Sequence, residues 1–235
     1  DGFDAQHKAG ILASLAHGFW IKPSQIFVEG IRHITTLDIE FARRMGYCIK
    51  LLGIVKKLGD NMQIAVHPAL VPEKHVLANV SGVYNAILVR GDIVGDTLHY
   101  GQGAGADATA SAVLSDLADA ALDLKNGSMG RVPPFVPHEE EGSVLPMDKA
   151  VSPFYLRLSV IDRPGTLAKI AAILGEAKIG ICSVMQPEGH VGESVPLIMM
   201  LHDAPDAAMQ KALKRIARLS AVKAKPTMIR VENFD

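Results

Sequence analysis

The chain has 235 residues, of which 49% are hydrophobic and 21% charged, and its formal net charge is −1. This length allows one large or two modest domains with real cores, and the composition is that of an ordinary soluble protein. A net charge near zero argues against nucleic acid as the main partner, because binding to phosphates needs a basic surplus or patch.

The cysteines and histidines show no pattern typical of a disulfide framework or a metal site. Cys48 and Cys182 are far apart in sequence, which suits a reducing cytoplasm, and the nine histidines include no H-x-x-x-H or H-E-x-x-H spacing. The uncharged run 9–21 is too short to span a bilayer. Because acidic residues precede it and no initiator Met is present, we expect a segment from inside a longer cytoplasmic protein rather than a signal peptide.

The first part of the chain predicts an α+β layer of about four antiparallel strands with helices on one side. Thr36 is expected to cap the second helix, and Gly59-Asp60-Asn61 to turn the first strand into the next. The predicted elements are helices 4–17 and 38–45, strands 47–57 and 62–66, a loop with a short helix at 67–80, and a hairpin of strands 84–90 and 96–100.

Asp4 and Lys8 are four residues apart on the first predicted helix, so their side chains share a face. A carboxylate and an ammonium at this spacing can form an ion pair. On spacing alone an ordinary surface pair is the favoured interpretation, since exposed i,i+4 pairs are common and each contributes only about 0.3–0.5 kcal/mol.

A glycine-rich run at 101–113 lies between a predicted strand and a predicted helix. Gly101, Gly103 and Ala106 match the G-x-G-x-x-G/A pattern of dinucleotide folds. A Rossmann core would continue into a second parallel strand that ends in an acidic residue, whereas here Asn126-Gly127-Ser128 and a Pro-rich segment follow. Two local interpretations stay open: small residues and free helix amides that bind an anion, or close packing of the helix.

The C-terminal part predicts a split ferredoxin-like domain of order βαββαβ. Apolar residues alternate over 154–161, the turn Asp162-Arg163-Pro164-Gly165 follows, and a helical period begins at Thr166. Strands at 179–185, 196–201 and 228–231 and a helix at 204–220 complete the order. We expect domains at 1–127 and 151–235, joined by an extended linker at 128–150 that is rich in proline and acidic residues.

Four ordered segments of the first domain resemble the homoserine dehydrogenase family. They are G-F-D-A-x-H-K-x-x-I-L-A-S-L-A at 2–16, E-G-I-x-x-I at 29–34, D-I-x-x-A-x-x-x-G-Y-x-I-K-L-L at 38–52 and G-x-G-A-G-x-x-x-T-A-S-A-V at 101–113. The resemblance implies a substrate and dimerisation domain from an enzyme that reduces L-aspartate 4-semialdehyde to L-homoserine with NADH or NADPH. That reaction is the branch point toward threonine, isoleucine and methionine.

The resemblance also implies roles for individual residues. Lys8 matches the family's catalytic lysine, which handles the proton on the substrate oxygen, and Asp4 matches the aspartate that binds substrate and holds the lysine. Gly103 and Gly105 match the cofactor-binding glycine run. The family's prolines in this run are replaced by Gln102 and Ala108, which loosens the loop.

The family's nucleotide-binding domain, its further substrate-contacting acids and a second lysine are absent from these residues. We therefore expect NAD(P) in the full-length enzyme but neither a bound cofactor nor turnover for this chain alone. In the family the helix after the glycine run packs on the nucleotide-binding domain. Its apolar stripe here, Val113, Leu114, Leu117 and Ala121, is expected to be exposed without that domain.

The C-terminal plan and its D-R-P-G turn resemble the ACT domain, a module that commonly binds amino acids at a dimer interface. By this resemblance the effector is threonine and the assembly a homodimer or homotetramer. The expected effector site comprises Asp162, Pro164, Gly165, Ile181 and Ser183, whose alternative role is turn geometry and packing. A function of another class also remains: a stand-alone, non-catalytic module that senses an amino acid and oligomerises.

Overall fold

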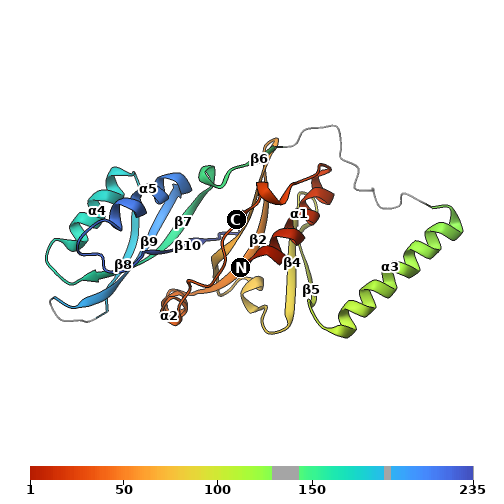
Figure 1. Ribbon diagram of the computed structural model, residues 1–235, viewed down its shortest axis with the longest axis horizontal. Helices are drawn as coiled ribbons and strands as arrows, with labels where there is room; N and C mark the ends of the chain where they lie inside the picture. The colour runs from red at the N-terminus through yellow and green to blue at the C-terminus, as the bar shows by residue number, and fades with distance from the viewer. Residues whose placement is uncertain (129–142, 188–191, 235) are drawn as a thin grey trace. The chain divides into compact units, whose positions relative to one another are not determined.

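The computed structural model of the protein describes residues 1–128, 143–187 and 192–234 (Figure 1). The chain divides into two compact units, which we describe separately. The main unit comprises residues 1–72 and 137–235, and the second unit comprises residues 73–136. None of the helices in the described ranges is long and apolar enough to cross a membrane.

The main unit is built on one mixed sheet in which strand β3 (Asn61–Pro72) pairs with other strands along both of its edges. Strand β2 (Tyr47–Leu58) pairs antiparallel with β3 along its whole length. The opposite edge is shared by three short strands that run parallel to β3: β6 (Ser143–Leu145), β1 (Phe27–Val28) and β10 (Thr227–Val231). Strand β10 therefore joins the C-terminal domain to the sheet of the N-terminal domain.

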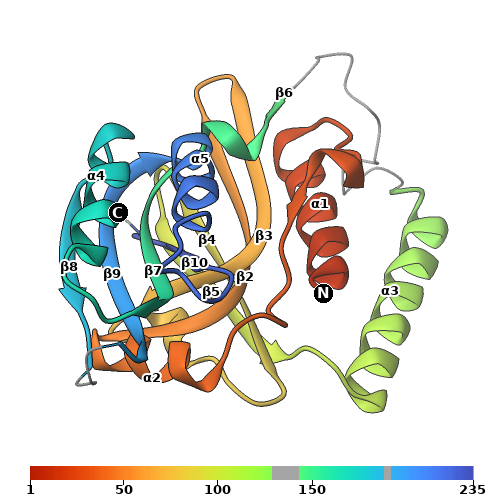
Figure 2. The same cartoon turned by 60° about the vertical axis from the view of Figure 1, so that its left-hand side comes forward.

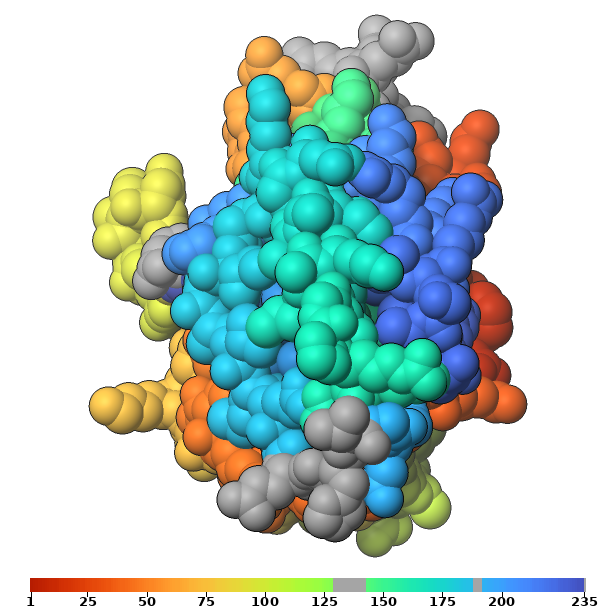
Figure 3. All heavy atoms as spheres, turned by 90° about the vertical axis from the view of Figure 1, so that its left-hand side faces the viewer, coloured from red at the N-terminus to blue at the C-terminus, as the bar shows by residue number. Residues whose placement is uncertain are grey.

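The C-terminal domain has the predicted ferredoxin-like plan. Its elements are β7 (Val151–Ile161), α4 (Thr166–Glu176), β8 (Ile181–Met185), β9 (Ser194–Pro205), α5 (Asp206–Ile216) and β10. The strand order is β10-β7-β9-β8, so the first and third strands of the domain are central and β8 is an edge. Helices α4 and α5 lie side by side on one face of these strands (Figure 2), and their side chains cover that face (Figure 3).

The alternation of β7 is confirmed, because Phe154, Leu156, Leu158 and Val160 are all buried beneath α4 and α5. Tyr155, on the opposite face, is also buried. It belongs to a second apolar cluster with Phe41 of helix α2 (Thr36–Arg44), which covers that face. The second face, predicted to be exposed, is thus buried at Tyr155 and of intermediate exposure at Arg157 and Ser159.

Helix α1 (Phe3–His17) packs on β2 and β3 through its small side chains. Ala9 and Ala13 are buried against Ile64 and Val66, whereas the larger apolar residues Ile11, Leu12 and Leu15 remain half-exposed. Small residues allow a close approach of the helix to the sheet. The short 3-10 helix η1 (Pro23–Gln25) follows α1 and leads into β1.

Several predicted boundaries of the N-terminal part are wrong in detail. The cap of α2 is Thr35 rather than Thr36. The Thr35 side chain accepts a hydrogen bond from the Asp38 amide, and the Thr35 amide donates one to the Asp38 carboxylate. Residues 67–72, predicted as a loop, continue β3, because their partners in β2 lie directly opposite. The prolines at 68 and 72 had suggested a break, yet both sit within the ladder.

The second unit contains a hairpin and a long helix. Its elements are η2 (Val76–Asn79), β4 (Tyr84–Gly91), β5 (Gly95–Gln102) and α3 (Ala106–Asn126). Strands β4 and β5 form a sheet of their own, so the predicted single layer of four strands is wrong, although the α+β class is confirmed. Helix α3 has no buried residue, as expected for its apolar stripe.

The predicted linker 128–150 lies mainly outside the described residues. In its last part, strand β6 pairs with β3, and the 3-10 helix η3 (Met147–Lys149) leads into β7.

Candidate active site and regulatory surfaces

Lys8 and Asp4 form the ion pair that their spacing indicates. Lys8 Nζ lies 2.8 Å from Asp4 Oδ2, and both side chains project into solvent with exposed fractions of 59% and 83%. Asp4 lies in the first turn of α1, where a carboxylate interacts favourably with the free amides of the helix. The pair therefore presents an ammonium and a free carboxylate oxygen on an accessible surface.

Helix α1 holds this pair on a fixed support. The Gln6 side chain donates to the Pro23 carbonyl at 2.7 Å, and Ser14 Oγ accepts from the Ile21 amide at 3.1 Å. Both bonds tie α1 to the segment that follows it. A charge pair on a helix that packs against a sheet can position a reacting group more narrowly than one on a loop.

The arrangement can stabilise negative charge that develops on the oxygen of a carbonyl group. An ammonium at hydrogen-bond distance from the carbonyl oxygen stabilises the developing alkoxide and can donate the proton. The neighbouring carboxylate holds the lysine side chain and can accept a further hydrogen bond through its second oxygen.

The glycine run of the second unit joins β5 to α3. The Gly103 amide donates to the Val83 carbonyl at 3.2 Å, and a Cβ at Gly103 would lie 1.8 Å from Asn85 Nδ2. Gly105 has φ of 130° and immediately precedes α3. Backbone without side chains at a helix start can approach a phosphate closely, so the two predicted cofactor residues lie in one suitable loop.

The five residues predicted to bind an effector fall into two groups. Asp162, Pro164 and Gly165 form the turn between β7 and α4, whereas Ile181 and Ser183 lie on β8. Ile161 pairs with Ser194 at one end of β9, and Ser183 pairs with Met200 farther along the same strand. At about 3.3 Å per residue, the two groups are about 20 Å apart along the sheet. The structure does not bring them together within one chain.

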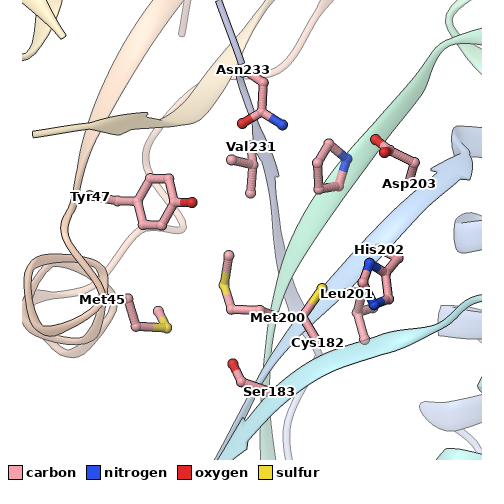
Figure 4. Close-up of a pocket in the computed structure, with 11 residues that line it drawn as sticks. Met45, Tyr47, Cys182, Ser183, Met200, Leu201, His202, Asp203, Val231 and Asn233 are labelled. Carbon is pink, nitrogen blue, oxygen red and sulfur yellow. The ribbon is translucent and has the colours of Figure 1, made fainter. Parts of the chain in front are cut away.

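One pocket of about 530 Å³ lies on the face of the C-terminal sheet opposite α4 and α5. Met45 and Tyr47 line one side of it, and Ser183 of β8 lines another (Figure 4). The other lining residues are Pro153, Cys182, Met200, Leu201, His202, Asp203, Val231 and Asn233. Ser183 is the only predicted effector residue among them.

Sequence reasoning missed a buried ion pair that joins α2 to β7. Arg157 donates to both carboxylate oxygens of Asp38 at 2.5 and 2.9 Å, and the Tyr155 hydroxyl donates at 3.1 Å. Burial alone would raise the pKa of Asp38, but the hydrogen bonds from Arg157 and Thr35 lower it below its ordinary value. Burial and the Asp38 charge raise the pKa of Tyr155, which stays protonated.

A second buried cluster lies around Arg230 of β10. Arg230 donates to Asp206 Oδ1 at 2.6 and 3.0 Å and to Glu29 Oε2 at 2.8 Å, and its guanidinium lies 5.0 Å from the centre of the Phe27 ring. Burial and the Arg230 charge lower the pKa of nearby His67 to about 4, so His67 is neutral at pH 7. The only sequence signal for this cluster was the E-G-I segment that begins at Glu29.

Within the described ranges, no three or more His, Cys, Asp or Glu side chains are grouped to hold a metal ion.

Comparison with known proteins matches this chain to one family. The homoserine dehydrogenase family model matches residues 1–118. The homoserine dehydrogenase of Neisseria gonorrhoeae is 39% identical over 237 residues, which covers 100% of this chain and 54% of that protein. The homoserine dehydrogenase of Pseudomonas aeruginosa is 38% identical, covering 100% of this chain and 55% of that protein.

The fold leads to the same family. A crystal structure of a homoserine dehydrogenase from Thiobacillus denitrificans superposes with a TM-score of 0.90 at 39% identity, over 99% of this chain and 53% of that one. A Staphylococcus aureus homoserine dehydrogenase superposes with a TM-score of 0.68 at 30% identity. The chain thus spans about half the length of the relatives that it matches.

Proposed function

This chain belongs to the homoserine dehydrogenase family, and on that premise we propose that it is the catalytic and regulatory part of an NAD(P)-dependent homoserine dehydrogenase. The reaction interconverts L-homoserine and L-aspartate 4-semialdehyde, in the cytoplasm, on the route to threonine, methionine and isoleucine. The observation that carries the proposal is the exposed Lys8–Asp4 pair on α1, 2.8 Å apart, within the segment that the family model matches.

Each side chain of the pair has a separate task. When bound, the nicotinamide supplies the hydride for the semialdehyde carbonyl. Lys8 donates a hydrogen bond to the carbonyl oxygen and then the proton that completes the alcohol. Asp4 keeps the lysine extended toward the substrate, and its second oxygen accepts from the substrate ammonium. In the oxidation of homoserine, Lys8 takes the proton back.

The cofactor loop is the run from Gly101 to Gly105. Its fit rests on Gly103, where the Asn85 side chain leaves no room for a Cβ, and on the free amides at the start of α3. The family's nucleotide-binding domain is needed for the remaining contacts. We therefore propose that this chain alone binds dinucleotide weakly and does not turn over.

Replacement of Lys8 tests the catalytic assignment. In the longer protein that carries these residues, Lys8→Met should lower kcat for homoserine oxidation by about 10²–10⁴-fold, the range typical of a lost general acid–base group. Initial rates of NAD(P) reduction measure kcat, and a fluorescence titration measures binding of the dinucleotide. Lys211→Met, at an exposed position of α5, is the matched control and should keep the full rate. A Lys8 variant as active as the control would refute the assignment.

The ferredoxin-like domain is proposed to act as an ACT domain that binds threonine between two copies of the chain. The two groups of predicted effector residues lie at separate places along the sheet, and β8 is a sheet edge with Val184 and Met185 partly exposed. Antiparallel pairing of two β8 edges would place the Ser183 end of one copy beside the Met185 end of the other, nearer the turn that contains Asp162. This pairing favours a homodimer or a homotetramer built from it.

Thermal unfolding with threonine, methionine, isoleucine and homoserine tests this regulation. A ligand at 100 times its Kd stabilises by about 2.7 kcal/mol, which raises Tm by several degrees for a chain of this size. A shift with threonine alone, lost in Ser183→Ala, is expected. If no amino acid raises Tm, the ferredoxin-like domain serves in assembly and does not bind an effector. A threonine response in a longer protein that lacks homoserine oxidation would instead favour a non-catalytic sensing module.

A further inference from the structure

Two strands of different domains meet end to end on one edge of β3. Strand β1 pairs with Ala65 and Val66, and β10 begins its pairing at Ala69. Arg230 of β10 reaches across the gap between the two strands to Glu29, which directly follows β1. The Arg230 side chain is only 3% exposed and also contacts Asp206 and Phe27, so its direction is fixed from several sides.

Glu29 belongs to a segment that touches the start of α1. Its amide donates to the Val66 carbonyl at 2.7 Å, which extends the β1 pairing by one residue. At the next residue, Gly30, an added Cβ would lie 3.0 Å from Asp1 Cα and 3.2 Å from the Asp1 carbonyl oxygen. Arg32 then donates to the Asp1 carboxylate at 2.8 Å. The residues immediately before α1 therefore rest on the segment held by Glu29.

The first turn of α1 is tied to the same place. Gly2 adopts φ of 91°, and a Cβ there would lie 3.0 Å from Val28 and 3.2 Å from Val66. Helix α1 begins at the following residue and carries Asp4 and Lys8 in its first two turns. A displacement of residues 28–30 would consequently displace the backbone from which the Lys8–Asp4 pair projects.

We propose that Arg230 of the C-terminal domain is a positioning residue for Lys8 and Asp4, acting through Glu29 and the segment that follows it. The domain proposed to bind an effector thus holds part of the catalytic helix in place. The catalytic role of Lys8 rests on the proposed function, whereas the positioning of α1 does not.

The Asp38–Arg157 pair provides a matched control within the same molecule. It also joins the C-terminal sheet to the N-terminal part through a mostly buried guanidinium, 15% exposed, that holds both oxygens of one carboxylate. That carboxylate is on α2 rather than on the segment against α1. Arg230→Lys and Arg157→Lys make the same chemical change, because each keeps a cation and loses the planar fork. Only the first should affect α1.

Hydrogen exchange of this chain tests the positioning directly. In Arg230→Lys, the amides of residues 6–10 should exchange several-fold faster than in the unaltered chain, and Arg157→Lys should leave them unchanged. Glu29→Ala removes the link and keeps the Arg230–Asp206 contact, so it should reproduce the effect even if Arg230 variants fold poorly. Unchanged exchange in both Arg230→Lys and Glu29→Ala, or equal acceleration in Arg157→Lys, would overturn the proposal.

Kinetics of the longer protein provide the second readout. Glu29→Ala and Arg230→Lys should lower kcat for homoserine oxidation by about 10–100-fold with little change in KM for the dinucleotide, since a misplaced acid–base group slows chemistry more than cofactor binding. Equal kcat in all variants of an active protein would contradict the positioning role. If the unaltered longer protein does not oxidise homoserine, the proposed function fails, and the exchange result alone decides on the positioning of α1.

Discussion

At the scale of single residues, the charges that matter most to stability are the buried ones. Asp38 is fully buried and carries its charge only because Arg157, Tyr155 and the Thr35 cap surround it with donors. The Arg215–Glu176 pair between α5 and α4 is equally short, at 2.5 Å, but it is a single bond and its side chains are 50% and 61% exposed. Water screens the exposed Arg215–Glu176 pair, whereas the Asp38–Arg157 pair is shielded from water.

Removing the partner of Asp38 should be costly. Arg157→Met leaves a buried carboxylate without its cation and should lower the free energy of unfolding by about 3–5 kcal/mol. Arg215→Met should lower it by less than about 1 kcal/mol. Urea unfolding of the two variants measures both values. Equal losses would show that burial does not distinguish these pairs.

His67 predicts how stability depends on pH. Its pKa is lowered to about 4 in the folded protein, against an ordinary value of 6.5, so between these two values the unfolded chain binds a proton that the folded protein does not. Stability from this residue is therefore complete above about pH 6.5 and falls as the pH drops toward 4, by about 3 kcal/mol in total. Urea unfolding between pH 7 and pH 4 should show a smaller loss in His67→Gln than in the unaltered chain. The same loss in both would rule out His67 as the source.

At the scale of elements, the glycine run depends on one close contact in the second unit. Gly103→Ala places a methyl group on Asn85, whose side chain donates to the Val83 carbonyl at 3.4 Å. The loop must shift, so KM for the dinucleotide should rise by about tenfold, equivalent to about 1.4 kcal/mol of lost binding, with kcat little changed. The double variant Gly103→Ala with Asn85→Gly removes all three close contacts, of which the last is with Asn85 Cβ at 2.9 Å, and should recover most of the affinity. If the double variant does not recover its affinity for the dinucleotide, the methyl group acts through a contact other than the one with Asn85.

Sequence patterns predicted the elements of the C-terminal domain well, because each has a local signal. The alternation in β7, the Asp162–Gly165 turn and the period of α4 all come from neighbouring residues. The boundary of β3 was harder, since Pro68 and Pro72 are typical of loops. The cap of α2 was misplaced by one residue because two threonines are adjacent there.

At the scale of the whole molecule, the sequence could not reveal how the C-terminal domain joins the N-terminal sheet. The pairing of β10 with β3 involves Arg230 with Ala69 and Val231 with Leu70, more than 150 residues apart in the chain. No local period encodes such a contact. For the same reason, Arg230 was not predicted as a functional residue, whereas Lys8 and Asp4 were recognised through the segment around them.

We propose that this chain supplies the catalytic lysine and needs a nucleotide-binding domain beside it. The most direct test is the rate of homoserine-dependent NAD(P) reduction, measured for this chain alone and for the longer protein that contains it. We expect turnover by the longer protein and no detectable turnover by the chain alone. Homoserine oxidation by the isolated chain, or a longer protein that leaves homoserine unchanged, would contradict it.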